Sequence, residues 1–176
     1  DDVRALALRM RRRVPTYMDA RTASTLTERF SYCFKGHGGY PLILDRQADI
    51  VPLEQFTITG EGGPVTLLPV EQMHGRIMSL GFRIGNLAYC NDLHDFPEES
   101  LEALTGLDTL ILDALRYTPH PSHAHLERAL DWIERLAPKE AWLTNLHIDM
   151  DYQTLCKELP DHVRPAYDGL ALDFPL

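Results

Sequence analysis

Histidines and aspartates follow several of the apolar runs in this sequence, and both residue types bind divalent metal ions. His74 follows the run LLPVEQM, Asp92 follows NLAYC, and His147 ends AWLTNLH. Asp113 ends TLILD, and three histidines lie in the segment behind it: His120, His123 and His125. Because loops converge at the strand ends of open α/β sheets, we expect these side chains to lie near one another. Imidazole and carboxylate groups are ligands of Zn²⁺ and Mn²⁺, so the pattern indicates a metal site.

Each of these residues also has an ordinary structural explanation. An aspartate at a strand end is often a turn former or a helix cap. A histidine in a loop is often simply solvated, and we expect this of His37, His94 and His162. The stretch LTNLHIDMD leaves two interpretations of His147 open. It is either a metal ligand at a strand end or an ordinary polar residue where the strand reaches the surface.

Apolar periodicity predicts a mixed α/β framework for these residues. Helical patterns occur in five segments, residues 3–12, 22–30, 97–106, 126–136 and 151–159. Strand patterns occur in eight segments, residues 14–19, 56–60, 65–73, 77–85, 86–90, 107–115, 140–147 and 166–174. Thr22 or Ser24 is expected to cap the second helix and Ser122 the fourth, and the Gly-rich residues 34–47 are expected to form a surface loop. This order predicts one α/β domain over residues 1–176, with helices on the faces of its sheet.

The bulk properties disfavour several classes of protein. The chain has 176 residues, 44% of them hydrophobic, which suits a folded domain with a core, and no apolar run is long enough to cross a bilayer. The net charge of −9 disfavours nucleic-acid binding, which needs a basic surface. One basic cluster, RMRRR at residues 9–13, is expected to be the solvated face and last turn of a helix. Three widely spaced cysteines, Cys33, Cys90 and Cys156, favour a cytoplasmic location.

Several segments, in this order, resemble the metallo-β-lactamase-fold hydrolases. They are VEQMHG, LGFRIGNLAYCNDLHDFPEESLEAL, LDTLILDALRYTPHPSHAHLERALDWIERL, WLTNLHIDMDY and AYDGLALD, and they cover nearly the whole chain from Val70 onward. Within that superfamily they are most similar to the PhnP-like phosphoribosyl cyclic phosphodiesterases of the carbon–phosphorus lyase pathway. The resemblance implies an αββα sandwich. It also implies that this chain is the C-terminal larger part of such a domain and lacks its N-terminal strands.

The resemblance also implies roles for individual residues. His74 matches a histidine that binds a metal, and Asp92 matches the carboxylate that bridges two metal ions. His123 matches the histidine that donates a proton to the leaving oxygen, and His120 and His123 are expected to contact the substrate. The last metal ligand of the family is a histidine at the end of the strand that WLTNLH matches.

The sequence departs from the family pattern in two places. The residue aligned with the last histidine ligand is Asn145, and His147 lies two residues further on, where it would point to the same side of an extended strand. We favour His147 as the ligand. The alternative is that Asn145 is a weak ligand and that His147 contacts the ligands without binding the metal itself. The family's His-x-His-x-Asp-His segment does not occur in this chain, which begins at Asp1 without a Met. We expect that segment upstream and expect a chain of this length to be inactive alone.

The function implied is that of a metal-dependent hydrolase, a phosphodiesterase that acts on a small cyclic or nucleotide-like phosphodiester through a metal-bound hydroxide. The implied cofactors are two divalent metal ions, Zn or Mn, and the implied partner is a small phosphodiester or nucleotide; no membrane partner is expected, and a homodimer is left open. Two alternatives remain. One is an RNase Z-like tRNA 3′-processing endonuclease, which the acidic charge disfavours. The other is a degenerate, non-catalytic binding member of the same fold, which Asn145 would suit.

Overall fold

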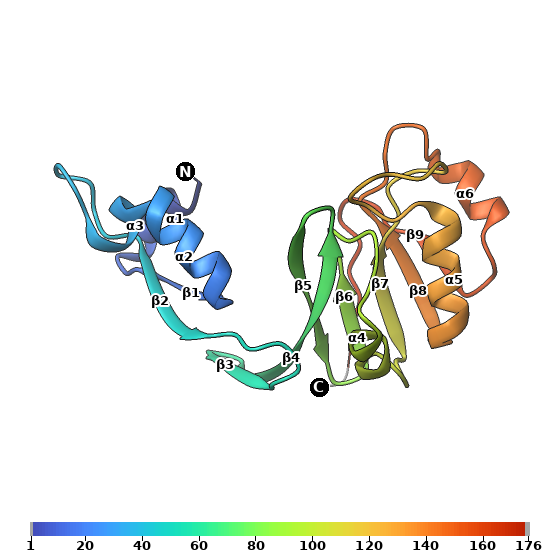
Figure 1. Cartoon of the computed structure of the whole chain (residues 1–176), viewed down its shortest axis with the longest axis horizontal. Helices are drawn as coiled ribbons and strands as arrows, with labels where there is room; N and C mark the ends of the chain where they lie inside the picture. The colour runs from blue at the N-terminus through green and yellow to red at the C-terminus, as the bar shows by residue number, and fades with distance from the viewer. Residues whose placement is uncertain (1, 175–176) are drawn as a thin grey trace. The chain divides into compact units, whose positions relative to one another are not determined.

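The computed structural model describes residues 2–174 and divides the chain into two compact units, Asp1–Val51 and Pro52–Leu176 (Figure 1). Each unit has its own cluster of buried apolar side chains. No helix within residues 2–174 is long and apolar enough to span a membrane. That residues 1–176 form a single domain stays a prediction.

The first unit is built from three helices and a pair of strands. In chain order these are α1 (Asp2–Met10), β1 (Val14–Met18), α2 (Ala20–Arg29), α3 (Ser31–Lys35) and β2 (Leu44–Asp49). Strands β1 and β2 pair in parallel, and Ala7, Cys33 and Ile43 form the small buried cluster beside them. The prediction of a loop over residues 34–47 is wrong at both ends, because α3 and β2 extend into that range.

The cap of α2 also differs from the prediction. The side chain of Asp19 accepts hydrogen bonds from the backbone N–H of Thr22 at 2.9 Å and from its hydroxyl at 2.7 Å. Neither Thr22 nor Ser24 is therefore the cap. Asp19 is the residue before the helix, where a side-chain oxygen reaches the free N–H groups of the first turn.

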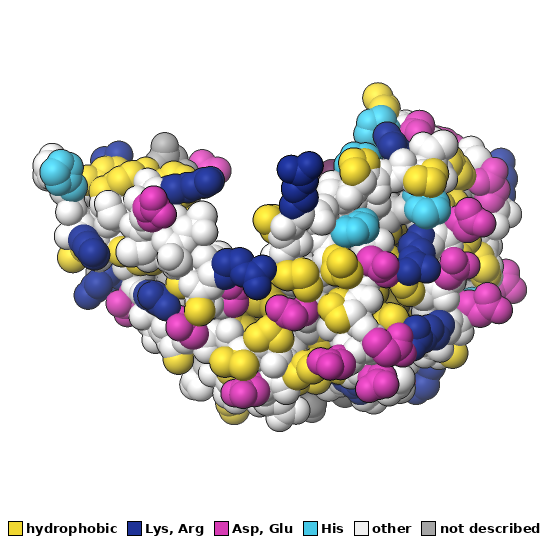
Figure 2. All heavy atoms as spheres, viewed as in Figure 1, with side chains coloured by type: hydrophobic (Ala, Val, Ile, Leu, Met, Phe, Trp, Pro, Cys, Tyr) yellow, Lys and Arg dark blue, Asp and Glu magenta, His cyan; other side chains and the backbone are white. Residues whose placement is uncertain are grey.

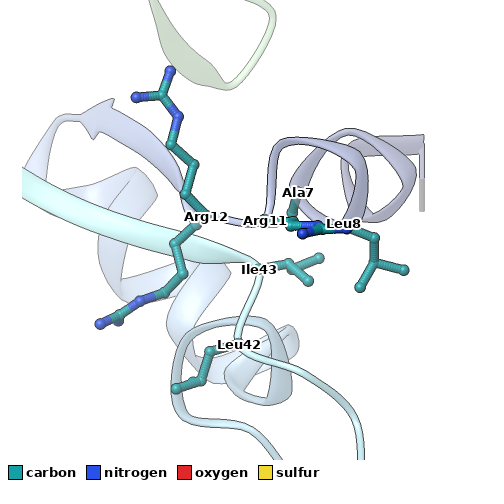
Figure 3. Close-up of a pocket in the computed structure, with 7 residues that line it drawn as sticks. Ala7, Leu8, Arg11, Arg12, Leu42 and Ile43 are labelled. Atoms are coloured by element: carbon teal, nitrogen blue, oxygen red, sulfur yellow. The ribbon is translucent and has the colours of Figure 1, made fainter.

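The basic cluster RMRRR lies at the end of α1 and just beyond it. Arg9 is in the last turn, and Arg11, Arg12 and Arg13 follow the helix with exposed side chains, so the expected solvation of this cluster is confirmed. Arg13 forms an ion pair with Asp45 at 3.4 Å. Figure 3 shows Arg11 beside Ala7 and Leu8, at a cavity of about 430 Å³ whose lining residues are Ala7, Leu8, Arg11, Arg12, Arg13, Leu42 and Ile43.

The second unit is a seven-stranded sheet whose strands follow one another in sequence order. The strands are β3 (Phe56–Gly60), β4 (Gly63–His74), β5 (Ile77–Ile84), β6 (Leu87–Cys90), β7 (Thr109–Asp113), β8 (Glu140–Thr144) and β9 (Val163–Pro165). Pairing is antiparallel from β3 to β6 and parallel from β6 to β9. Strands β4, β6, β7, β8 and β9 therefore all run in the same direction and end at the same edge of the sheet.

Three helices cover one face of this sheet: α4 (Glu98–Ala103), α5 (Leu126–Leu136) and α6 (Tyr152–Glu158). Figure 1 shows them beside the parallel half of the sheet. Alternate strand residues on that face are fully buried, namely Ala88, Cys90, Leu110, Leu112, Ala141 and Leu143. They share one apolar cluster with Leu101, Ile133 and Leu155 of the three helices. The predicted mixed α/β fold with helices on the sheet is confirmed.

Three predicted element boundaries in this unit are wrong. Ser122 does not cap α5, because the residue before the helix is His125 and its side chain makes no capping hydrogen bond. Strand β8 ends at Thr144 rather than at residue 147. The predicted last strand over residues 166–174 is wrong, because β9 is Val163–Pro165 and the residues after it, as far as 174, are irregular.

The close packing around Gly81 of β5 gives a test of this sheet. A Cβ atom at Gly81 would lie 3.0 Å from Cys90 Sγ and 3.1 Å from Gln72 Cδ. Gln72 is fully buried and its amide donates to the Asn91 carbonyl at 2.8 Å, so it has little freedom to move. We expect Gly81→Ala to lower the free energy of unfolding by about 1–3 kcal/mol, measured by urea denaturation. Gly60→Ala is the control, because no atom lies within 4 Å of its added Cβ; a similar loss in both variants would contradict the packing argument.

Candidate metal centre

The sheet topology brings four of the predicted site residues to one edge. His74 is the last residue of β4, Asp113 is the last residue of β7, and Asp92 lies two residues after β6. These three strands run in the same direction, so their last residues lie at the same edge. His123 reaches this edge from the loop that precedes α5. Figure 2 shows several histidine side chains (cyan) on the second unit, gathered over one end of the sheet.

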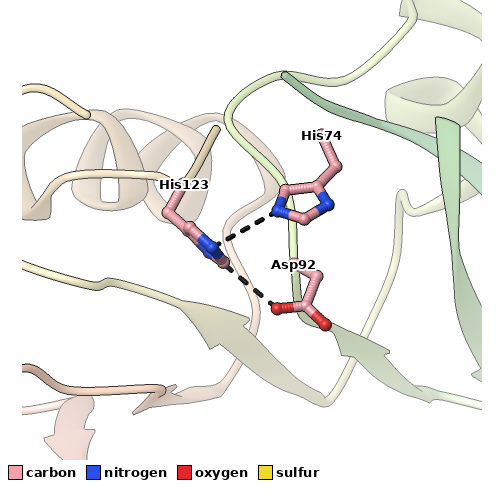
Figure 4. Close-up of side chains that lie close together, drawn as sticks. All are labelled: His74, Asp92 and His123. Carbon is pink, nitrogen blue, oxygen red and sulfur yellow. Dashed lines mark hydrogen bonds and ion pairs between the residues drawn. The ribbon is translucent and has the colours of Figure 1, made fainter. Parts of the chain in front are cut away.

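Three side chains that could hold a metal ion come together at this edge. His74 Nε2 lies 3.3 Å from His123 Nε2, and His123 Nδ1 lies 3.9 Å from Asp92 Oδ1. The ligand atoms of His74, Asp92 and His123 all lie within 4.8 Å of one another. Figure 4 shows the imidazole ring of His123 directed toward both His74 and Asp92. Among residues 2–174, this is the one group of three such side chains that gathers in this way.

A buried carboxylate fixes the orientation of His123. Asp113 is fully buried, and its Oδ2 lies 2.7 Å from His123 Nδ1. The same oxygen accepts the backbone N–H of Leu93 at 3.3 Å, and Oδ1 accepts the side-chain amide of Asn145 at 3.2 Å. Since a carboxylate only accepts hydrogen bonds, it holds the proton of His123 on Nδ1 and leaves Nε2 facing His74.

Electrostatics at the site follow from burial. Desolvation by burial raises the pKa of Asp113 above its ordinary value, although the hydrogen bonds from His123, Leu93 and Asn145 favour its charged form. The pKa of His120 is lowered, because desolvation and the positive charge of Arg116 disfavour its protonated form. His120 lies against His123, with ring centroids 5.3 Å apart, so the two histidines expected to contact the substrate are neighbours.

His147 lies elsewhere in the structure. Its Nδ1 is hydrogen-bonded to the carboxylate of Asp149, which lowers the pKa of that carboxyl. The assumption that an extended strand would bring His147 to the place of Asn145 is wrong, because β8 ends at Thr144 and Asn145 has a positive φ of 60°. It is Asn145 that reaches the cluster, with its amide nitrogen 3.2 Å from His123 Nδ1. The ligand role of His147 stays a prediction.

Two further residues support the site through hydrogen bonds that the sequence did not predict. His94, expected to be solvated, is half-buried, and its Nδ1 accepts the backbone N–H of Gly75 at 3.1 Å, directly after His74. Asp113 was expected as a strand-end carboxylate, and its bond to His123 spans ten residues. The sequence signal for Asp113 is its place directly after the apolar residues Leu110, Ile111 and Leu112, which predicts a buried carboxylate in need of donors.

The residues present fit a divalent metal ion. Two imidazoles and one carboxylate are a donor set that suits Zn²⁺ or Mn²⁺. Histidines that bind metals usually donate their other ring N–H to a carboxylate or carbonyl, and Asp113 accepts Nδ1–H of His123 in that manner. Asp92 is exposed, with its side chain 55% accessible, so its oxygens are open to an ion and to solvent.

Comparison with known proteins agrees with the fold. The family model of the beta-lactamase superfamily domain matches residues 1–148, and the chain belongs to this family. A crystal structure of a diphosphatase from the PhnP family is 32% identical, with a TM-score of 0.80 over 93% of this chain and 60% of that chain. The expected similarity to metallo-β-lactamase-fold proteins and to the PhnP family is therefore confirmed.

Two other proteins extend the comparison. An octanoyltransferase of Porphyromonas gingivalis is 30% identical over 174 residues, which are 97% of this chain and 34% of that protein. The chain thus spans about a third of the length of this relative, whose name describes the protein as a whole. Zn²⁺-bound PqqB from Methylobacterium extorquens has a TM-score of 0.63 over 96% of this chain and 65% of its own, and at 18% identity the similarity concerns the fold alone.

The hydrogen bond between Asp113 and His123 can be tested by the position of the His123 proton. In the wild-type protein we expect the ¹⁵N resonances of His123 to show a proton on Nδ1, because that nitrogen faces the carboxylate. In Asp113→Ala this preference should be lost, and the free energy of unfolding should fall by about 1–3 kcal/mol, because buried donors lose their acceptor. Asp149→Ala is the control, since it should alter the resonances of His147 and leave those of His123 in place. An unchanged His123 spectrum in Asp113→Ala would contradict the assignment.

Proposed function

We propose that this chain belongs to a metal-dependent hydrolase that cleaves a small cyclic or nucleotide-like phosphodiester. The observation that carries the proposal is the meeting of His74, Asp92 and His123 at one sheet edge, with His123 fixed by the buried Asp113. Support also comes from the 32% identity with a diphosphatase of the PhnP family. The net charge of −9 favours a small substrate over a nucleic acid, whose binding needs a basic surface.

His74 and Asp92 are the residues proposed to hold the metal. A bound divalent ion supplies an activated water molecule at neutral pH and stabilises the charge on a phosphoryl oxygen. His74 is the last residue of β4, and the backbone N–H of Gly75 directly after it donates to His94 Nδ1 at 3.1 Å. Asp92 presents its carboxylate from a left-handed backbone conformation with φ 59°, directly opposite the His123 ring.

His123 is proposed to donate the proton to the leaving oxygen. An unprotonated alkoxide is a poor leaving group, so a positioned acid accelerates the cleavage. The Nδ1 of His123 is engaged by Asp113 at 2.7 Å, so Nε2 is the atom that exchanges a proton with the substrate. The Asp113 carboxylate holds the His123 ring in one orientation for this transfer. His120, whose ring lies beside that of His123, is proposed to contact the same substrate.

The proposed cofactor is a pair of ions, Zn²⁺ or Mn²⁺. With His123 as the acid, His74 and Asp92 are the clustered side chains left to hold metal among residues 2–174, and two donors suit one ion better than two. The second ion needs ligands of the kind that the family's His-x-His-x-Asp-His segment provides. We therefore expect residues 1–176 alone to hold one ion weakly and to be inactive on bis(p-nitrophenyl) phosphate. The same chain preceded by that segment is expected to hydrolyse it, as measured by p-nitrophenol release and metal analysis.

Substitutions in the active, extended form separate the two proposed roles. His74→Ala should weaken metal binding by at least about tenfold, because it removes a ligand. His123→Ala should keep the metal and lower kcat by about 10²–10⁴-fold, because it removes the acid. Metal content by atomic emission and turnover of bis(p-nitrophenyl) phosphate measure the two effects.

A histidine far from the cluster provides the control for these variants. His162→Ala should change neither quantity, because His162 is exposed and lies outside the cluster. Loss of metal in His123→Ala would show that His123 is a ligand rather than the acid. His147→Ala tests the predicted ligand role of His147. If His147 binds the metal, this variant should contain less metal than the wild-type protein. Absence of hydrolysis by the extended wild-type form would overturn the proposed function itself.

A further inference from the structure

Two polar side chains of β4 and β5 contact the backbone at Asp92, and the proposed chemistry does not use them. Gln72 of β4 and Ser79 of β5 are directly opposite each other in the antiparallel pairing of these strands. The Gln72 amide nitrogen lies 3.1 Å from Ser79 Oγ, so the two side chains are hydrogen-bonded across the strands. Gln72 is fully buried, and its amide occupies space that Gly81 leaves free, since a Cβ atom there would collide with Gln72 Oε1.

Both side chains hold the backbone on either side of the Asp92 Cα atom. The Gln72 amide donates a hydrogen bond to the carbonyl of Asn91 at 2.8 Å. The Ser79 hydroxyl donates to the carbonyl of Asp92 itself at 2.6 Å. The peptide group before Asp92 and the peptide group after it are therefore each fixed by one of these two side chains.

The backbone conformation at Asp92 makes these two hydrogen bonds important. Asp92 has a positive φ of 59°, a left-handed conformation that is uncommon for residues other than glycine. Its side chain is 55% accessible, so the surrounding protein does little to fix the direction of the carboxylate. That direction depends instead on the backbone that carries the side chain, and Gln72 and Ser79 hold this backbone in place.

Gln72 also connects Asp92 to the other residue proposed to hold the metal. His74 follows Gln72 by two residues on β4, so their side chains lie on the same face of the strand. One strand thus carries a proposed metal ligand and the side chain that fixes the turn of the other ligand. Residues that orient metal ligands through hydrogen bonds change metal affinity by about 10–100-fold when they are substituted.

We propose that Gln72 and Ser79 are positioning residues of the metal centre, which hold the turn at Asp92 so that its carboxylate meets the metal ion bound by His74. The proposal rests on the proposed function for the metal-binding roles of His74 and Asp92. It goes beyond that function because it assigns the support of the ion to two side chains that act through the Asp92 backbone.

The test begins with Ser79, because its side chain is only half-buried and can be changed without opening the core. In the extended form of the chain, Ser79→Ala removes the hydroxyl that donates to Asp92, and Ser79→Thr restores a hydroxyl. We expect Ser79→Ala to raise the Zn²⁺ dissociation constant at least about tenfold. Ser79→Thr should return it to within about threefold of the wild-type value. Competition with a chelating dye measures the dissociation constant, and urea denaturation measures the stability of each variant.

A hydroxyl pair elsewhere in the same sheet provides the matched control. Thr57 Oγ1 of β3 lies 3.0 Å from Thr66 Oγ1 of β4. Thr66→Ala also removes a hydroxyl that is hydrogen-bonded across two strands, but it leaves the turn at Asp92 untouched. We therefore expect Thr66→Ala to bind Zn²⁺ with the wild-type dissociation constant.

Gln72→Met removes both amide donors and should raise the Zn²⁺ dissociation constant at least as much as Ser79→Ala does. An unchanged constant in Ser79→Ala or Gln72→Met, an equal rise in Thr66→Ala, or no recovery in Ser79→Thr would overturn the proposal. Absence of Zn²⁺ binding by the wild-type protein would overturn it as well. The dissociation constant is an equilibrium quantity and is independent of turnover. Failure of the proposed function shows instead as absence of bis(p-nitrophenyl) phosphate hydrolysis by an extended form that binds Zn²⁺.

Discussion

The arrangement of the site depends on one buried carboxylate, that of Asp113. Its two oxygens receive donors from three separate segments: Leu93 after β6, His123 before α5 and Asn145 after β8. A carboxylate buried without partners would be very costly, so these donors are required by the burial itself. Backbone hydrogen bonds join the same segments to one another. Ala124 donates to the Leu93 carbonyl at 2.6 Å, and Ala114 donates to the Thr144 carbonyl at 3.1 Å. The need to satisfy Asp113 thus fixes the loops that place the functional side chains.

The backbone is strained at the two places where the site needs an abrupt change of direction. Asp92 and Asn145 both have positive φ, 59° and 60°, and both follow strands that end at the metal-centre edge. Such conformations cost of order 1 kcal/mol for most residues and less for Asp and Asn, whose short polar side chains tolerate them. The turn at Asn145 directs its amide to Asp113 and His123, and the turn at Asp92 directs its carboxylate toward His123. Both residues are therefore suited to their positions by backbone conformation as well as by side-chain chemistry.

Much of this arrangement could be predicted from the sequence, and the failures have physical causes. Apolar runs located six of the seven strands of the large sheet, β3 to β8, and the resemblance to the family assigned His74, Asp92 and His123, which lie together in the structure. The predicted ends of strands were wrong where tertiary contacts determine them. Strand β8 ends at Thr144 because Asn145 turns toward Asp113, a contact across 32 residues that no local pattern contains. Likewise the segment after β9 has strand-like composition, but its pairing with β8 ends near Ala166 and the chain turns at Gly169, with φ 90°.

The resemblance to the family implies a histidine at the position of Asn145, and the contacts of the asparagine show what its amide does at this place. Its amide nitrogen donates to Asp113 Oδ1 at 3.2 Å. Among the described residues, His123 is the histidine that is hydrogen-bonded to this carboxylate. Asn145 also lines a cavity together with Thr144, Leu146 and Asp168. The same residue thus supports the carboxylate that orients His123 and forms part of the cavity wall, so the metal-centre cluster and the cavity share one side chain.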